Sequence, residues 1–190
     1  MKSSLFIYGV HNPTTIRKIL TFFIFIALVL CFWGIHSDFI PYEQWAWTGF
    51  FISITLGSTL SFFILRAFWT GNATFKRNTS RFMKAMVYLW LPCMVNFIIW
   101  VSVVHGIGAL VSEYFGQPME KVVTLEKKHN RSRRSCDFHL DGVYLDSAFP
   151  SRYCISERVY NQLPIIEQYR LFGLESNLGY FYDYVEKTEG

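Results

Sequence analysis

The chain has 190 residues, of which 52% are hydrophobic and 19% aromatic, and its formal net charge is +4. Three long apolar runs account for this hydrophobic fraction, which excludes a chain that folds as one soluble domain. The basic residues are concentrated in segments that border the apolar runs, so the positive charge does not predict nucleic-acid binding.

The three apolar runs are each long enough for a transmembrane helix and cover residues 19–35, 46–65 and 86–111. A helix rises about 1.5 Å per residue, so the shortest run reaches about 26 Å, enough for a thin bilayer. Asn12-Pro13 predicts the start of the first helix, with Asn12 as its N-cap. The first run ends in bulky Phe32-Trp33 without a cleavage site, so we expect this helix to be retained.

The distribution of charge predicts the orientation of these helices. Eight Lys and Arg residues and no acid lie in segment 1–18 and in the second loop with its borders, 66–84. Ten Lys and Arg and fourteen acids lie in the first loop and after the third run. Loops rich in Lys and Arg stay in the cytoplasm, so 1–18 is the expected cytoplasmic N-terminal segment. Residues 112–190 would then form an extracytoplasmic domain, and we expect a cell membrane location, in the bacterial inner membrane.

The basic loop 66–84 has two interpretations. Its aromatic and basic residues alternate, so it either forms an interfacial helix that binds anionic lipid heads or only fixes the topology.

The second apolar run has a small residue at every fourth position. On a helix such residues share one face and let a neighbouring backbone approach closely. The sequence therefore predicts helix packing through this stripe, against another span or a second copy of the chain. Its members are Gly49, Ser53, Gly57 and Ser61.

The third run contains a proline and two strongly polar residues. Pro92 frees a backbone carbonyl and predicts a bend. Asn96 and His105 raise the hypothesis of a proton or ion relay. We favour a structural interpretation, in which Asn96 bonds to another helix and His105 lies near the outer boundary, because no Asp, Glu or Lys lies in the run to complete a relay.

After Gly116 the apolar pattern changes from helical to alternating, which predicts strands. We expect strands over 121–128, 136–140, 143–145 and 152–156, and a final hairpin of 168–174 and 179–185 with Glu175-Ser176-Asn177 near its tip. Asp141-Gly142 predicts a two-residue hairpin turn. Ser156 predicts the N-cap of a short helix that ends before Pro164 and buries Val159, Tyr160 and Leu163. The expected fold class is α+β: three transmembrane helices (19–111) followed by a small, mainly antiparallel β domain with one short helix (112–190).

Two cysteines, Cys136 and Cys154, lie in the C-terminal domain. Outside the cytoplasm such a pair is most often a disulfide, and closing this loop would stabilise a small domain by about 3 kcal/mol. The alternative is a metal site, because His129 and His139 lie nearby in the sequence. The spacings match no familiar zinc pattern, so we favour the disulfide and expect neither a metal nor a cofactor.

No catalytic constellation is evident in the sequence. Asp137, Asp141 and Asp146 near His139 offer acid–base groups, but charged residues on the exposed face of a small sheet are the usual finding. We therefore expect no enzyme activity.

Three functional hypotheses follow. The first is a multi-pass membrane protein that presents its domain to another membrane or periplasmic protein, as an accessory subunit of an envelope complex or an immunity-type protein. The second is a transport or channel component, which requires homo-oligomerisation through the small-residue stripe. The third is a membrane-bound enzyme acting on lipid or cell-wall precursors. The expected partners are the lipid bilayer and a protein, not nucleic acid.

Overall fold

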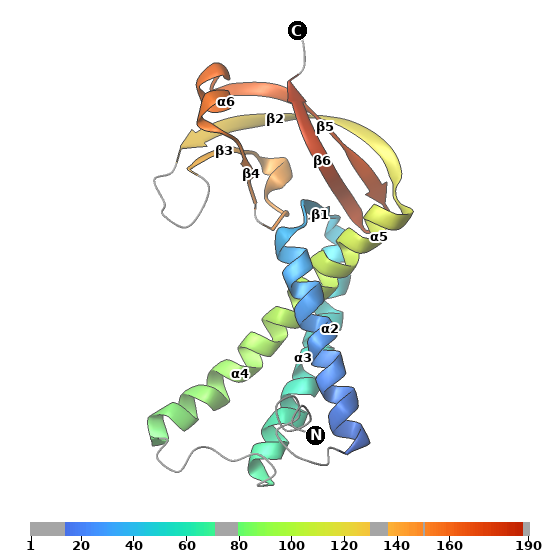
Figure 1. The fold of residues 1–190 in the computed structure, drawn as a ribbon, viewed down its shortest axis with the longest axis vertical. Helices are drawn as coiled ribbons and strands as arrows, with labels where there is room; N and C mark the ends of the chain where they lie inside the picture. Colours follow the sequence, from blue (N-terminus) through green and yellow to red (C-terminus); the bar gives the residue numbers. More distant parts are fainter. Residues whose placement is uncertain (1–13, 71–79, 130–136, 150, 188–190) are drawn as a thin grey trace, which may run out of the picture.

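The computed structural model describes residues 14–70, 80–129, 137–149 and 151–187. Three long apolar helices form one end of the molecule and a curled antiparallel sheet forms the other (Figure 1). The helices have 22, 27 and 35 residues, and each is long and apolar enough to cross a membrane. The expected combination of membrane-type helices and a β domain is confirmed at this level.

The helical region has three members, the third of which is composite. The first is α2 (Thr15–His36) and the second is α3 (Glu43–Trp69). The third runs through α4 (Arg81–Val101), a π-helix η1 (Ser102–Ile107) and α5 (Gly108–Phe115). The prediction of Asn12 as N-cap is wrong, because Thr14 caps α2: its side-chain oxygen accepts a hydrogen bond from the Arg17 N–H at 3.4 Å. Asn12 and Pro13 lie outside the described residues.

All strands of the sheet pair antiparallel, in the order β1-β6-β5-β2-β3-β4. The strands are β1 (Phe39–Pro41), β2 (Gln117–His129), β3 (Phe138–Asp141), β4 (Tyr153–Cys154), β5 (Ile166–Ser176) and β6 (Gly179–Lys187). A 3-10 turn η2 (Val143–Leu145) and the short helix α6 (Glu157–Gln162) complete the domain. The predicted final hairpin and the Ser156 N-cap are confirmed, since Ser156 Oγ accepts from the Val159 N–H at 3.4 Å.

Two details of the predicted β domain are wrong. Asp141-Gly142 is not a hairpin turn, because residues 143–145 form a 3-10 turn and β3 pairs with β4 instead. The 3-10 turn places Leu145 fully inside the core. The helix α6 also buries none of its residues, and Val159 is exposed.

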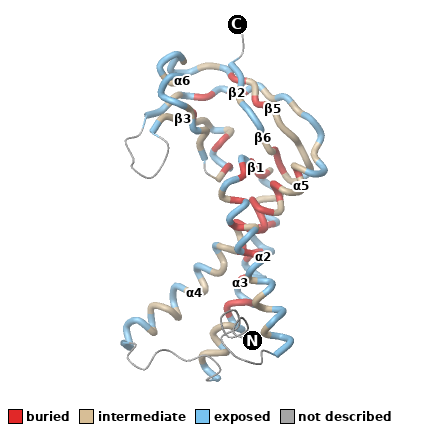
Figure 2. The backbone as a smooth tube through the Cα atoms, in the orientation of Figure 1, coloured by how far each residue is buried: buried red, intermediate tan, exposed pale blue. Residues whose placement is uncertain are grey.

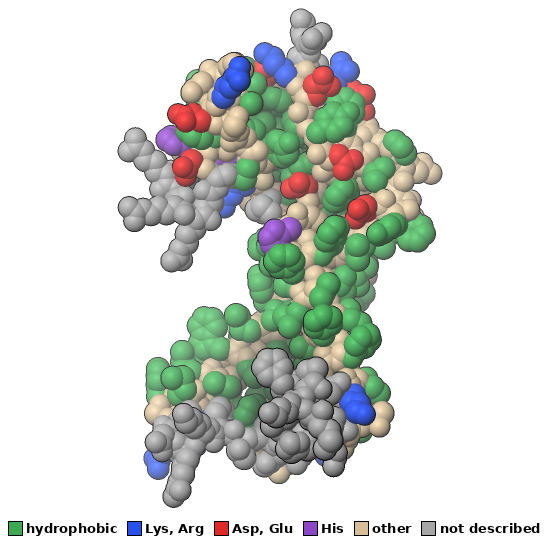
Figure 3. Space-filling view, viewed as in Figure 1, with side chains coloured by type: hydrophobic (Ala, Val, Ile, Leu, Met, Phe, Trp, Pro, Cys, Tyr) green, Lys and Arg blue, Asp and Glu red, His purple; other side chains and the backbone are tan. Residues whose placement is uncertain are grey.

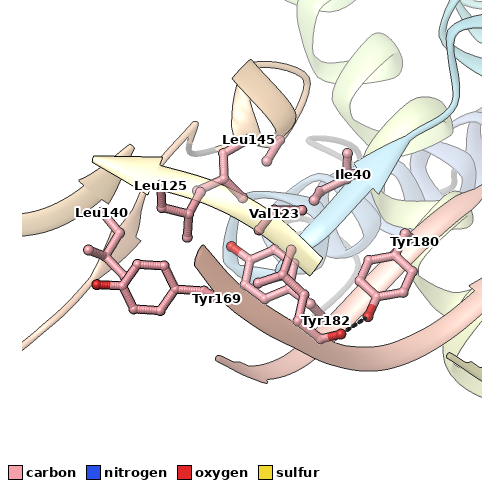
Figure 4. Packing of buried hydrophobic residues seen from close by; sticks show 10 residues of the cluster. Ile40, Val123, Leu125, Leu140, Leu145, Tyr169, Tyr180 and Tyr182 are labelled. Atoms are coloured by element: carbon pink, nitrogen blue, oxygen red, sulfur yellow. Dashed lines mark hydrogen bonds between the residues drawn. The ribbon is translucent and has the colours of Figure 1, made fainter. Parts of the chain in front are cut away.

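The core lies on the concave side of the sheet and contains aliphatic side chains and tyrosines (Figure 4). Tyr180 donates its hydroxyl to the Leu171 carbonyl at 2.8 Å, and Tyr182 donates to Asp38 at 3.3 Å. These bonds satisfy the polar ends of two otherwise apolar side chains. Burial raises the pKa of both phenols above its ordinary value, so they stay protonated donors.

The strand β1 comes from the short connection between the first two long helices, and no sequence pattern predicted it. Phe39 pairs with Phe181 and Ile40 with Tyr180, and the Tyr182 N–H donates to the Asp38 carbonyl at 3.1 Å. The sheet is thus attached to the helices both by β1 and by the continuous passage from α5 into β2 (Figure 1). These attachments fix the position of the sheet on the helices.

The small-residue stripe of α3 faces the third helix. Its four members are buried, and a Cβ added at Gly57 would lie 2.5 Å from Asn96 Oδ1. One added at Gly49 would lie 2.6 Å from a methyl of Val104. The stripe is therefore a contact within this chain.

Of the two polar residues of the third helix, Asn96 differs from the expectation. Asn96 donates to the Pro92 carbonyl of its own helix at 2.8 Å, so the expected bond to another helix is wrong. His105 is buried in the π-helix, with its ring edge-on to Trp100 and to Phe39. Burial is concentrated in the upper helical region and in the sheet core (Figure 2).

Candidate functional site

The strand β2 has one edge that is only partly paired. Along one side it pairs with β5 over ten residues, whereas on the other side it pairs with β3 only from Glu126 to His129. The Lys127 N–H donates to the Ile165 carbonyl at 2.9 Å, which sets the alternation of the ladder: odd-numbered β2 residues bond toward β5. The main-chain N–H and C=O groups of Glu120, Val122 and Thr124 therefore point to the edge that no described strand covers.

A groove of about 780 Å³ follows this open edge. The chain leaving β3 forms its wall and passes close to β2, because a Cβ on Gly142 would lie 2.9 Å from the Thr124 carbonyl oxygen. Three apolar side chains are displayed along it: Val143 is 89% exposed, Ile166 62% and Val122 52%. We call this feature the β2-edge groove. The residues that line it are Lys121 to Glu126, Lys128, Asp141 to Tyr144, Asp146 and Ile166.

The charged side chains of the groove largely engage one another. Lys128 Nζ lies 2.8 Å from an Asp141 carboxylate oxygen and 3.7 Å from Glu126. The Lys128 ammonium, by its hydrogen bond, lowers the pKa of the Asp141 carboxyl below its ordinary value. Lys121 Nζ lies 4.2 Å above the Tyr144 ring, a cation–π contact. The groove therefore offers apolar surface and main-chain groups more than unbalanced charge.

The open edge has the geometry to pair with an extended polypeptide. An open edge presents donors and acceptors every second residue, the spacing at which an extended polypeptide offers its own. Among the described residues, no group of three or more His, Cys, Asp or Glu side chains is placed to hold a metal ion.

Of the proposed metal ligands that the structure describes, His139 lies opposite Cys154 in the β3–β4 register, whereas His129 lies apart from this pair. The register pairs His129 with Phe138 and Lys128 with His139. Because neighbouring residues of a strand point to opposite faces, His129 and His139 lie on opposite sides of the sheet. His129 instead stacks on Phe138, with ring centroids 4.7 Å apart.

The structure describes only one of the two cysteines that were predicted to form a disulfide. Cys154 lies in β4 opposite His139, whereas Cys136 lies outside the described residues. The Cys136–Cys154 disulfide stays a prediction. We expect alkylation of the unreduced protein to label neither residue, and labelling of both only after reduction, detected by mass spectrometry of the peptides. Labelling of both without reduction would contradict the bridge.

We expect the free energy of unfolding to depend on pH through the titration of His139. Burial lowers its pKa, and the nearby Arg152 guanidinium acts in the same direction. Because the pKa of His139 is lower in the folded protein than in the unfolded chain, where it is about 6.5, protonation favours unfolding as the pH falls through this range. Its contribution to the free energy of unfolding should drop by up to about 1.4 kcal/mol per pH unit in that range.

The variant His139→Gln lacks this titration. Denaturant unfolding of wild type and variant between about pH 7.5 and 5.5 should therefore show a stability difference that shifts steadily against the wild type as the pH falls. A difference that stays constant with pH would contradict the assignment.

Sequence reasoning missed the β2-edge groove. Its only sequence signal is the apolar Val143 after Asp141-Gly142, which the hairpin interpretation placed in a strand. The strand lengths that open the edge, 13 residues in β2 and 4 in β3, emerge only from the fold. No protein-family model matches the chain, and neither a curated protein nor a solved structure matches it.

Proposed function

We propose that this protein is a membrane-anchored binding module whose sheet domain, on the extracytoplasmic side, engages an extended segment of a partner protein at the β2-edge groove. The observation that carries the proposal is the edge of β2 at Glu120, Val122 and Thr124, which no further described strand pairs and which the exposed Val143 borders. Added strands bind through main-chain hydrogen bonds, and pockets for alternate side chains supply selectivity. Val122 and Val143 offer such apolar contacts.

The attachment of the sheet domain to the helices supports a binding role. Because β1 belongs to the sheet while α5 continues into β2, the groove is held at a fixed place relative to the helices. A preorganised site loses less conformational entropy when it binds.

The proposal that the sheet domain lies outside the cytoplasm is based on the distribution of Lys and Arg. The helix ends away from the sheet carry Lys and Arg but no acid, which is typical of the cytoplasmic side. The basic residues are Arg17, Lys18, Arg66, Arg81 and Lys84. The Cys136–Cys154 bridge belongs to this proposal, since it requires an oxidising compartment. In a bacterial inner membrane, the role would be that of an accessory subunit of an envelope complex or an immunity-type protein.

Site-specific photocrosslinking in living cells tests the proposal. A benzophenone amino acid placed at Val143 or Val122 should give one discrete protein adduct, because both side chains border the groove. The matched control position is Tyr184, which is similarly exposed but lies on β6. It should not give the same adduct.

A substitution then distinguishes main-chain pairing from simple proximity. Thr124→Pro removes an N–H that points to the open edge and that the β5 ladder does not use, a position where an edge strand accepts proline. It should abolish the adduct from Val143, whereas Thr124→Val, which keeps the N–H, should preserve it. An adduct unaffected by Thr124→Pro, or no adduct from either groove position, would contradict the proposal.

A further inference from the structure

A second groove, of about 850 Å³, lies where the helices meet the sheet. The start of α3, the end of α5 and the turn between β5 and β6 form it, and we call it the junction groove. Its lining is partly apolar and partly polar: Val111, Phe115 and Leu178 on the one hand, and Tyr42, Gln44, Gln117, Glu175, Ser176 and Asn177 on the other.

The polar wall of the junction groove is held in place by hydrogen bonds. The Tyr42 N–H donates to the Leu178 carbonyl at 3.0 Å, and the Tyr42 hydroxyl donates to the Glu175 carboxylate. Behind the wall, the hydroxyls of Ser112 and Ser176 are 2.7 Å apart. Glu175 is thus a fixed, half-buried carboxylate on the surface of the groove.

The surroundings of the groove are acidic. The three segments that meet here, 37–44, 108–120 and 173–183, contain no Lys or Arg. They do contain six acids, Asp38, Glu43, Glu113, Glu120, Glu175 and Asp183, of which Glu120 forms an ion pair with Arg170 at 3.2 Å. Figure 3 shows Asp and Glu side chains over the sheet next to the apolar helices. The local charge therefore favours a cationic group and disfavours an anionic one.

Exposed aromatic side chains mark the level of the junction groove. Phe115 is 81% exposed and Tyr114 73%, both at the end of α5, and Trp47 near the start of α3 is 57% exposed. Such rings are typical of the headgroup level of a bilayer. At the headgroup level of a bilayer, such a groove would border acyl chains on one side and headgroups on the other.

We propose that the junction groove binds a phospholipid whose headgroup carries an ammonium group, of the phosphatidylethanolamine type. The ammonium donates hydrogen bonds to the Glu175 carboxylate, and the upper part of an acyl chain lies against Val111 and Phe115. The amide groups of Gln44 and Gln117 supply donors for the phosphate. This lipid site is separate from the β2-edge groove and does not depend on partner binding.

Native mass spectrometry of the full chain in detergent tests this site. The protein is titrated with phosphatidylethanolamine, phosphatidylcholine and phosphatidylglycerol that share the same acyl chains. We expect the ethanolamine lipid to bind best, the choline lipid less well because it keeps the charge but lacks N–H donors, and the glycerol lipid least. Equal affinity for the ethanolamine and glycerol lipids would overturn the proposal.

Two matched substitutions locate the binding. Glu175→Gln should weaken binding of the ethanolamine lipid by about tenfold, because it removes a charge-assisted hydrogen bond, and should not weaken binding of the glycerol lipid. Asp183→Asn removes the same charge from the same acidic region but outside the groove, and it should leave the lipid order and affinities unchanged. Equal effects of the two substitutions would show a general charge effect and would overturn the site at Glu175.

Discussion

Replacing Gly106 by alanine is expected to destabilise the folded protein by about 2 kcal/mol or more. A Cβ at this position would lie 2.4 Å from the Leu30 carbonyl oxygen, a backbone atom that cannot rotate away. The crossing is reciprocal, because a Cβ on Gly34 would lie 2.7 Å from the Gly106 nitrogen. Alanine improves helix propensity by about 1 kcal/mol, but separating two packed helices costs about 3 kcal/mol.

Thermal unfolding of the detergent-purified protein measures this effect. The variant should unfold at a clearly lower temperature and give a lower yield. Val29→Leu, which adds volume on the exposed face of α2, is the matched control and should behave as wild type. An unchanged unfolding temperature for Gly106→Ala would show that α2 and η1 do not cross at this contact.

Replacing Phe39 by alanine is expected to have the largest effect, about 3–5 kcal/mol of lost stability. Phe39 is fully buried between the helices and the sheet, and Cβ atoms added at Gly108 and Gly179 would lie 2.4 and 2.6 Å from its ring. Its removal leaves a cavity at the attachment of β1. The sheet domain should then separate more readily from the helices.

Limited proteolysis distinguishes this local loss from general unfolding. In Phe39→Ala, cleavage should appear first in the connections of the sheet, while the helical fragment persists. Phe22→Ala, which removes an exposed phenylalanine from α2, should retain the wild-type cleavage pattern and stability. Wild-type protease resistance in Phe39→Ala would contradict the role of β1 as an attachment.

The sequence predicts those parts of the fold that local patterns specify. Long apolar runs indicate the helices, and alternation together with a Ser N-cap indicates β2, the final hairpin and α6. The strand β1 has no such signal, because a three-residue Phe-Ile-Pro segment becomes a strand only through β6, about 140 residues later in the chain. Asp141-Gly142 has a true turn signal, but the chain continues into a 3-10 turn and β3 pairs with the later strand β4.

The candidate site was less accessible to sequence reasoning than the fold. The edge is open because β2 is longer than its neighbour β3. The residue types at Glu120, Val122 and Thr124 do not indicate this difference in length. The Gly34–Gly106 crossing shows the same difficulty, since only the small-residue stripe of α3 has a repeating pattern. Contacts between distant segments decide both features.

The proposed function is tested most directly by measuring on which side of the membrane the sheet domain lies. A reporter that is active only outside the cytoplasm, fused after Gly190, should be active, and the same reporter inserted in the loop between α3 and α4 should be inactive. This is the result that the charge distribution predicts. An inactive reporter after Gly190 together with an active one in the loop would place the sheet domain in the cytoplasm and contradict the proposed function.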